Sequence, residues 1–285
     1  AGPTIHSCGP LVDGVGSYHP YVAVELDDPA AAQSLVQSLK QQGAECLKVY
    51  FLLRPPVLRS VVAAAHQAGL RVTGHIGVRT SWGQALDAGI DGFNHIRTWA
   101  DFLPLSEQPQ GENESLDGQK NQIPRMQADW SQIDPESARV TALLDRMAAA
   151  KIGFDPTLSI QQIGDSYRKA YGLEQYAKAT QSYARMSRFV ARAVEKKVPL
   201  LAGTDDGSLY DELEAYAKAG VPVDTILKSA TSAGADWLGD SAQFGTLTAG
   251  KRGDLILVEG DPTKDVHDLR KILTVVQAGR VVFQK

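Results

Sequence analysis

Short apolar runs alternate with amphipathic helical stretches along most of this chain, and this alternation limits the possible folds more than any other feature. The runs that we expect to be strands span residues 4–8, 46–51, 70–74, 92–95, 153–156 and 198–202. Between them, hydrophobic residues recur at helical spacing over residues 29–42, 56–68, 81–88, 135–147, 165–196, 210–219 and 223–238. Connections of this length are typical of parallel βαβ units, in which helices cover a sheet.

Two segments depart from this alternation. Residues 103–134 are dominated by Pro, Gln, Glu, Asn, Asp and Gly, which predicts a long loop that is either a functional lid or partly disordered. Strands are expected at residues 254–258, 272–278 and 281–283, the last two joined by a tight turn. We therefore divide the chain into an α/β body, residues 1–243, and a small all-β portion, residues 244–285.

The charge balance and the hydropathy pattern exclude several classes of partner. The chain has 29 Lys and Arg against 33 Asp and Glu, whereas a nucleic-acid binder normally carries a basic stripe. No stretch approaches 18 consecutive apolar residues, and no leader resembles a signal peptide. We expect neither a nucleic acid nor a membrane as partner, and a cytoplasmic location. Because the chain begins at Ala1 without a Met, a cleaved leader and export stay open.

The two cysteines, Cys8 and Cys46, are too few for a disulfide framework and show no zinc-finger spacing. We expect both to be small buried apolar side chains.

Four residues that carry chemistry lie at comparable places on four predicted strands. His75 and His95 close two strands, Asp205 follows a third, and Lys48 lies within an otherwise apolar fourth. A buried lysine needs a partner or a chemical change. Groups at the carboxyl ends of parallel barrel strands converge on one mouth. A lone strand histidine is more often a packed core residue, but the four together predict metal chemistry.

The other histidines are weaker candidates. His66 lies in a predicted helix and His267 in a charged surface stretch, so both are interpreted as structural. His6 within a predicted strand and His19 in a loop stay secondary candidates.

These residues carry a resemblance to the amidohydrolase superfamily, and within it to the metal-dependent dipeptidases and carboxypeptidases that include prolidase-like and imidazolonepropionase-related enzymes. The resemblance covers nearly the whole chain. The matching motifs, in chain order, are Lys48-Val49-Tyr50, Gly74-His75, Asn94-His95, Ala202-Gly203-Thr204-Asp205, Glu212-Leu213 and the run from Gly245 to Leu255. Each motif is weak alone, but their order and spacing are specific.

The resemblance implies a (β/α)8 TIM-type barrel with a small C-terminal β-sandwich portion. The family begins with a His-x-His pair on its first barrel strand, and no such pair is present here. The sequence predicts six strands for the body, whereas a closed barrel needs eight. We therefore expect strands 3 to 8 only, so that the chain is a fragment or is completed by a complementing N-terminal segment. A histidine that often precedes the family's Glu-Leu is replaced by Asp211.

By the same resemblance, Lys48, His75 and His95 hold one divalent metal, most simply Zn²⁺, while Lys48 and Asp205 keep part of a second site. The lysine of this family is often carboxylated. Three protein ligands with an open position suffice for a catalytic zinc. Asp205 is then expected to take a proton from the attacking water and to deliver it to the leaving amine.

The reaction implied is amide hydrolysis of dipeptides or N-acyl amino acids. Tyr50 lies on the same strand face as Lys48, and with Arg97, or Arg54 in the next loop, it is a candidate to bind the substrate's free carboxylate. The alternatives are a cyclic-amide or lactone hydrolase, or an inactive truncated remnant that serves as a binding or scaffold protein. A homo-oligomer is left open.

Overall fold

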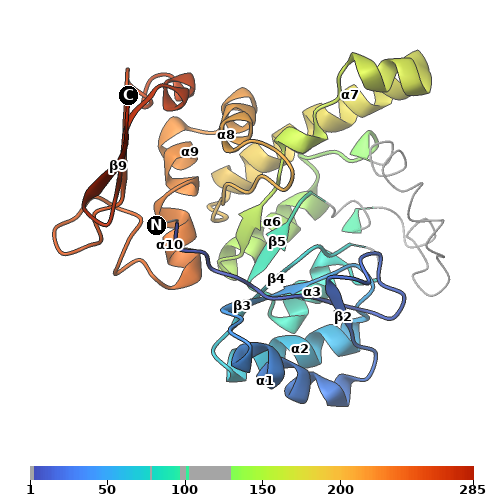
Figure 1. Cartoon of the computed structure of the whole chain (residues 1–285). Helices are drawn as coiled ribbons and strands as arrows, with labels where there is room; N and C mark the ends of the chain where they lie inside the picture. Colours follow the sequence, from blue (N-terminus) through green and yellow to red (C-terminus); the bar gives the residue numbers. More distant parts are fainter. Residues whose placement is uncertain (1–2, 78, 97–100, 103–129) are drawn as a thin grey trace.

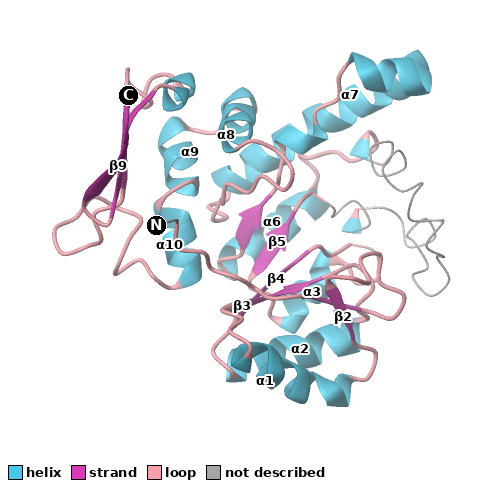
Figure 2. Ribbon diagram, viewed as in Figure 1, coloured by secondary structure: helices cyan, strands magenta, loops and turns pink. Residues whose placement is uncertain are grey.

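Six parallel strands form the sheet at the centre of the body (Figures 1 and 2). The computed structural model describes residues 3–77, 79–96, 101–102 and 130–285. The strand order is β2-β1-β3-β4-β5-β6, and each pairing is parallel. The strands are β1 Leu11–Asp13, β2 Ala23–Glu25, β3 Cys46–Val49, β4 Arg71–Gly74, β5 Gly92–Asn94 and β6 Gly153–Asp155.

Helices connect the strands and cover the sheet, as the alternation predicts. They are α1 Ala32–Gln41, α2 Pro55–Gln67, α3 Trp82–Ala88, α6 Ala138–Ala149, α7 Asp165–Glu195, α8 Leu209–Lys218, α9 Val223–Ser229 and α10 Ser232–Leu238. Short 3-10 helices are η1 Pro29–Ala31, η3 Ser159–Gln161 and η4 Val266–Arg270. Within the described residues, no helix combines the length and apolar character needed to cross a membrane.

Local sequence explains where α3 begins and ends. The Ser81 side chain accepts a hydrogen bond from the Gln84 backbone N–H, and the Gln84 side chain accepts one from the Ser81 backbone N–H. This reciprocal capping satisfies two amide groups that have no partner within the helix. Gly89 ends α3 in the left-handed conformation, with φ 85°. The N-cap of α6 is Ser137 rather than the predicted Asp134, so α6 begins three residues later than expected.

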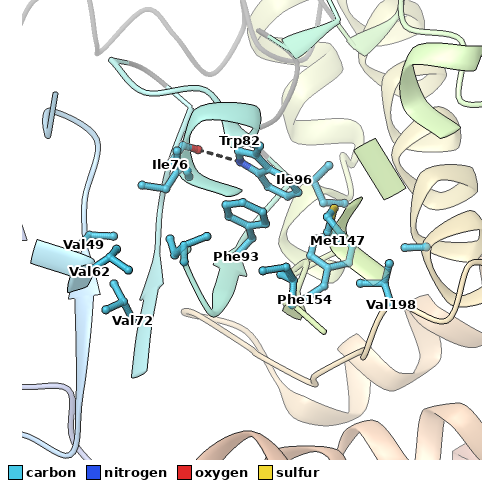
Figure 3. Packing of buried hydrophobic residues seen from close by; sticks show 14 of the residues in the cluster. Val49, Val62, Val72, Ile76, Trp82, Phe93, Ile96, Met147, Phe154 and Val198 are labelled. Atoms are coloured by element: carbon cyan, nitrogen blue, oxygen red, sulfur yellow. Dashed lines mark hydrogen bonds between the residues drawn. The ribbon is translucent and has the colours of Figure 1, made fainter. Parts of the chain in front are cut away.

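The core lies between the sheet and its helices (Figure 3). Trp82 on α3 stacks on Phe93 of β5, with ring centroids 4.0 Å apart and planes 11° apart. Phe154 of β6 packs edge-on against Trp82 at 5.8 Å. The Trp82 indole N–H donates to the Ile76 carbonyl oxygen at 3.2 Å, so the buried ring leaves no polar group unsatisfied. Because strand side chains alternate, Val49 and Phe93 face the helices while their neighbours face the other way.

A second, antiparallel sheet follows the body, as predicted for residues 244–285. It has the order β7-β8-β9, with β7 Leu255–Val258, β8 Ile272–Gln277 and β9 Arg280–Gln284. It stands at one end of the molecule, beside α9 and α10 (Figure 1). Its strands are intermediate or exposed throughout.

The strand predictions need three corrections. Residues 4–8 form no strand, and the first two strands are β1 and β2, which were not predicted. Residues 198–202 supply only an isolated bridge, Leu200 to Phe154. The six parallel strands form an open sheet and not a closed barrel. The strands β1 and β2 were missed because they lie among Gly9, Pro10, Gly14, Gly16 and Pro20, residues that are typical of turns and loops.

The cysteine prediction is wrong. Cys8 and Cys46 form a disulfide, which joins the segment before β1 to the first residue of β3. Cys46 is buried, as expected, but Cys8 lies in an exposed segment and is held by the covalent link and not by burial. The predicted lid at residues 103–134 falls mostly on residues 103–129, which lie outside the described part of the chain.

Candidate functional site

The carboxyl ends of β3, β4 and β5 bring three of the predicted ligands to one edge of the sheet. Lys48 of β3 pairs in register with Thr73 of β4, which places His75 one step past the end of β4. His95 follows the last residue of β5. The side chain of Lys48 alternates with Leu47 and Val49, which are fully buried under the helices, so Lys48 is on the opposite face.

The two predicted histidines lie in direct contact. The ring centroids of His75 and His95 are 4.3 Å apart, and the residues are 4% and 5% exposed. This spacing is compatible with two imidazoles that share one metal ion, since ligand bonds of about 2 Å span it. Among the described residues, no three His, Cys, Asp or Glu side chains converge closely enough to hold a metal. A third ligand from the predicted set would therefore have to be Lys48.

Asp205 also reaches this edge. Its carboxylate oxygen Oδ2 lies 3.9 Å from Nδ1 of His95, and its side chain is about half exposed. Three non-glycine residues here have a left-handed backbone: His95 at φ 64°, Thr157 at φ 45° and Asp205 at φ 48°. Each such conformation costs about 1–3 kcal/mol and persists only where the surroundings impose it. Strain gathered on three neighbouring residues is typical of a functional site.

Asp155, at the end of β6, is a site residue that the sequence analysis missed. Its carboxylate is buried beside the site, and its Oδ2 accepts a hydrogen bond from the Asn94 amide at 3.1 Å. Asn94 in turn accepts from the Thr73 hydroxyl at 3.0 Å, so three neighbouring strands are linked. Only glycine fits at position 203, because a Cβ there would lie 2.0 Å from Oδ1 of Asp155.

The electrostatic surroundings of Asp155 are unusual. Burial raises the pKa of its carboxyl group to about 7, and the charge of Glu212 adds to this. The Asn94 hydrogen bond and the positive charge of Lys48 lower the pKa, but they do not offset burial. A strand-end carboxyl with a perturbed pKa beside two histidines is characteristic of active sites. The sequence could have indicated this residue, because Asp155 lies near the end of the predicted strand at residues 153–156.

Tyr50 lies beside His75, and its hydroxyl contacts His19, a secondary candidate in the sequence. Its ring lies edge-on to that of His75, with centroids 4.9 Å apart. Nε2 of His19, in the loop after β1, lies 3.2 Å from the Tyr50 hydroxyl. The two side chains therefore place an imidazole and a phenol together beside His75.

Three other candidates among the described residues each pair with an aspartate or a glutamate. Arg97 lies outside the described residues. Arg54 forms an ion pair with Asp27, with 2.9 Å between guanidinium and carboxylate. His66 is hydrogen-bonded to Asp91 at 2.8 Å, as fits its structural interpretation. His6 lies 2.5 Å from Glu45, which precedes β3 and so is at the opposite end of that strand.

A family model and several solved structures resemble this chain. The family model described as "Amidohydrolase family" matches residues 52–282. Among curated proteins, none matches this sequence.

Three solved structures illustrate the likeness in fold. A Xaa-Pro dipeptidase with bound methionine in its active site is 20% identical, with a TM-score of 0.65, and the match covers 93% of this chain and 60% of the dipeptidase. A putative prolidase from Bifidobacterium longum is 21% identical, with a TM-score of 0.72 and coverage of 99% and 67%. Ochratoxinase from A. niger is 16% identical, with a TM-score of 0.70 and coverage of 100% and 67%. The chain thus spans about 60–67% of the length of these proteins.

Proposed function

This chain belongs to the amidohydrolase family, and we propose that it is a metal-dependent hydrolase that cleaves amide bonds of dipeptides or N-acyl amino acids. The observation that carries the proposal is the contact between His75 and His95, two imidazoles from successive strand ends, with Asp205 3.9 Å from the second. The names of two fold neighbours, a Xaa-Pro dipeptidase and a putative prolidase, favour the same class of substrate.

The residues present fit a zinc ion provided that Lys48 is a ligand. His75 and His95 supply imidazole nitrogens, which zinc prefers. An ammonium group is repelled by a dication, so we propose that Lys48 is carboxylated when one or two metal ions are bound, which turns it into an oxygen donor. If a divalent ion were held by these residues, its charge would supply activation of a water molecule near neutral pH.

The remaining groups act on substrate and proton. Asp205 is half exposed beside His95, where its carboxylate takes the proton of the attacking water and returns it to the leaving amine. The Tyr50 hydroxyl and the His19 ring lie 3.2 Å apart, and the proton that their mutual hydrogen bond does not use is available to a substrate carboxylate. This recognition favours substrates with a free carboxylate over cyclic amides and lactones.

The first test is metal content. The chain is prepared without chelator, supplied with zinc and analysed for metal, and we expect at least one zinc per chain. His75→Gln and His95→Gln are expected to abolish binding. His267→Gln is the matched control, because that histidine is exposed and pairs with Asp265 on the surface. A wild-type chain that holds no zinc would overturn the proposal and favour an inactive binding protein.

The same preparation tests substrate class. Amidating the carboxylate of an N-acyl amino acid is expected to lower kcat/KM by about 10- to 100-fold, the size of one charged hydrogen bond. Tyr50→Phe is expected to remove most of this preference, whereas Tyr21→Phe, at a 99% exposed position, leaves it intact. Equal rates on the acid and its amide would contradict recognition of a free carboxylate and would favour cyclic amides as substrates.

The compartment is a separate proposal. Disulfides persist in oxidising compartments and are rare in the cytoplasm. The Cys8–Cys46 link therefore supports export over the cytoplasmic location that composition alone favours. Two reduced thiols in the protein in its native compartment would contradict this.

A further inference from the structure

Thr157 has a backbone conformation that its own side chain disfavours. It lies two residues after β6, is 1% exposed and has φ 45°. A β-branched residue in the left-handed region is a genuine outlier, and glycine or asparagine would occupy the position at lower cost. Local backbone stability therefore does not account for a threonine here.

The hydrogen bonds of the Thr157 hydroxyl fix the direction of its contact with His95. The hydroxyl lies 2.8 Å from the Pro156 carbonyl oxygen, which can only accept, so Thr157 donates its single proton there. Nδ1 of His95 lies 2.7 Å from the same hydroxyl oxygen. Because the hydroxyl proton is already used, Nδ1 must be the donor in this contact. Asp205, whose Oδ2 is 3.9 Å from Nδ1, favours a proton on the same nitrogen.

The turn after Thr157 is fixed by hydrogen bonds to Glu212. Glu212 on α8 is fully buried, and its two carboxylate oxygens accept from the backbone N–H groups of Leu158 and Ser159 at 2.7 and 2.6 Å. Short hydrogen bonds to a carboxylate are roughly twice as strong as neutral ones. The strained residue is thus anchored by a buried charge on its C-terminal side.

We propose that Thr157 is a positioning residue that holds the neutral ring of His95 in the Nδ1-protonated tautomer. A neutral imidazole carries one N–H, so the lone pair is then on Nε2, the form that a metal ligand requires. The tautomer is a property of the metal-free chain. Its use in metal binding rests on the proposed function.

The chain offers a matched pair of variants. Thr157→Val keeps the branched shape and hence the backbone strain, but removes the hydroxyl. Thr157→Ser keeps the hydroxyl and removes a methyl group. Nitrogen NMR of the metal-free, histidine-labelled chain, at a pH where the imidazoles are neutral, reports which ring nitrogen carries the proton. The His95 signals are assigned by their loss in His95→Gln.

We expect the wild type and Thr157→Ser to show a proton on Nδ1, and Thr157→Val to shift His95 toward the Nε2-protonated form. A wild-type ring protonated on Nε2, or a Thr157→Val ring that keeps the Nδ1 proton, would overturn the proposal. A folding defect is recognised separately, because it would disturb the signals of His66 and His267 as well.

Zinc affinity supplies the second readout. Loss of a group that orients a ligating histidine typically weakens metal binding by about 10- to 100-fold, so Thr157→Val is expected to raise the zinc Kd by that factor and Thr157→Ser to restore it. Equal weakening in both variants would indicate a packing role and overturn the proposal. If the wild type binds no zinc, the proposed function fails, while the tautomer experiment still decides the role of Thr157.

Discussion

The body and the C-terminal sheet use the same residue types in opposite ways. In the body, Trp82, Phe93, Phe154 and Phe189 are fully buried and their rings contact one another. In the sheet β7-β8-β9, the side chains of β9 are about half exposed, Phe283 at 49%. Apolar residues therefore form strands in both places, but those of the body are buried, whereas those of β9 are half exposed. Strand propensity and burial are separate properties in this chain.

The attachment of the C-terminal sheet is partly polar. Arg270 of η4 donates to Glu214 of α8 at 2.6 Å and also pairs with Asp211. Between α9, α10 and β7 lies an apolar hollow of about 590 Å³, lined in part by Leu238, Phe244 and Ile256. An interface with such a gap gains less from burial than the close-packed body does.

Two aspartates show the same contrast in their electrostatics. Burial raises the pKa of Asp155 in the body to about 7. In the loop after β7, hydrogen bonds from Thr263, with a further contribution from Lys264, lower the pKa of Asp261 to about 2. The ionised form is thus disfavoured at the buried Asp155 and favoured at the exposed Asp261.

Truncation of one phenylalanine in each region is expected to give the largest difference. Phe93→Ala removes a buried ring stacked on Trp82 and should lower the free energy of unfolding by about 3–5 kcal/mol. Phe283→Ala, at a half-exposed position, should lower it by less than about 1 kcal/mol. Urea unfolding measures both. Similar losses would show that the C-terminal sheet is packed as tightly as the body, and the contrast would fail.

The aspartates predict different responses to pH in metal-free protein. The folded pKa of Asp155 lies above its ordinary value of 3.8. The folded state therefore keeps a proton that the unfolded chain releases between pH 4 and 7, and the free energy of unfolding falls as pH rises through that window. The total effect is up to about 4 kcal/mol. The free energy of unfolding should be lower at pH 8 than at pH 5, and Asp155→Asn should reduce this difference.

Asp261→Asn is the control for this experiment. The pKa of Asp261 is lowered, so its contribution is present above pH 4 and is lost only as pH falls toward 2. Its substitution should leave the difference between pH 5 and 8 unchanged. Parallel pH profiles for the wild type and Asp155→Asn would show that Asp155 does not titrate in this range.

The sequence predicted the parts of the fold that depend on long periodic patterns. The helices around residues 32–41, 55–67 and 165–195 were expected nearly at their observed bounds, because amphipathic spacing repeats over many residues. The N-cap of α6 was misplaced, since Asp134 and Ser137 are both good capping residues and only the three-dimensional context selects one. The strands β1 and β2 were missed because the glycines and prolines around them predict a loop.

Of the candidate residues at strand ends, the sequence analysis singled out His75 and His95 but missed Asp155, which lies at the end of β6. His75 and His95 are brought into contact, and Asp205 reaches the same edge. His19 was only a secondary candidate and Thr157 was not predicted at all, because their positions depend on loop conformations, which residue spacing does not encode. The disulfide between Cys8 and Cys46 could not be predicted either, because its partners are 38 residues apart and proximity depends on the fold.

Removal of the disulfide is expected to act locally, within the body. Cys8 and Cys46 close a loop that contains β1, β2 and α1, all in the body. By the loop-entropy model, Cys8→Ser with Cys46→Ser should lower the free energy of unfolding by about 2–4 kcal/mol. Dithiothreitol should lower the free energy of unfolding of the wild type by the same amount and leave that of the double variant unchanged. Amide exchange should accelerate in β1 and β2 and not in β8. Equal acceleration in β8 would mean that the two regions unfold as one unit and that their contrast in packing has no counterpart in stability.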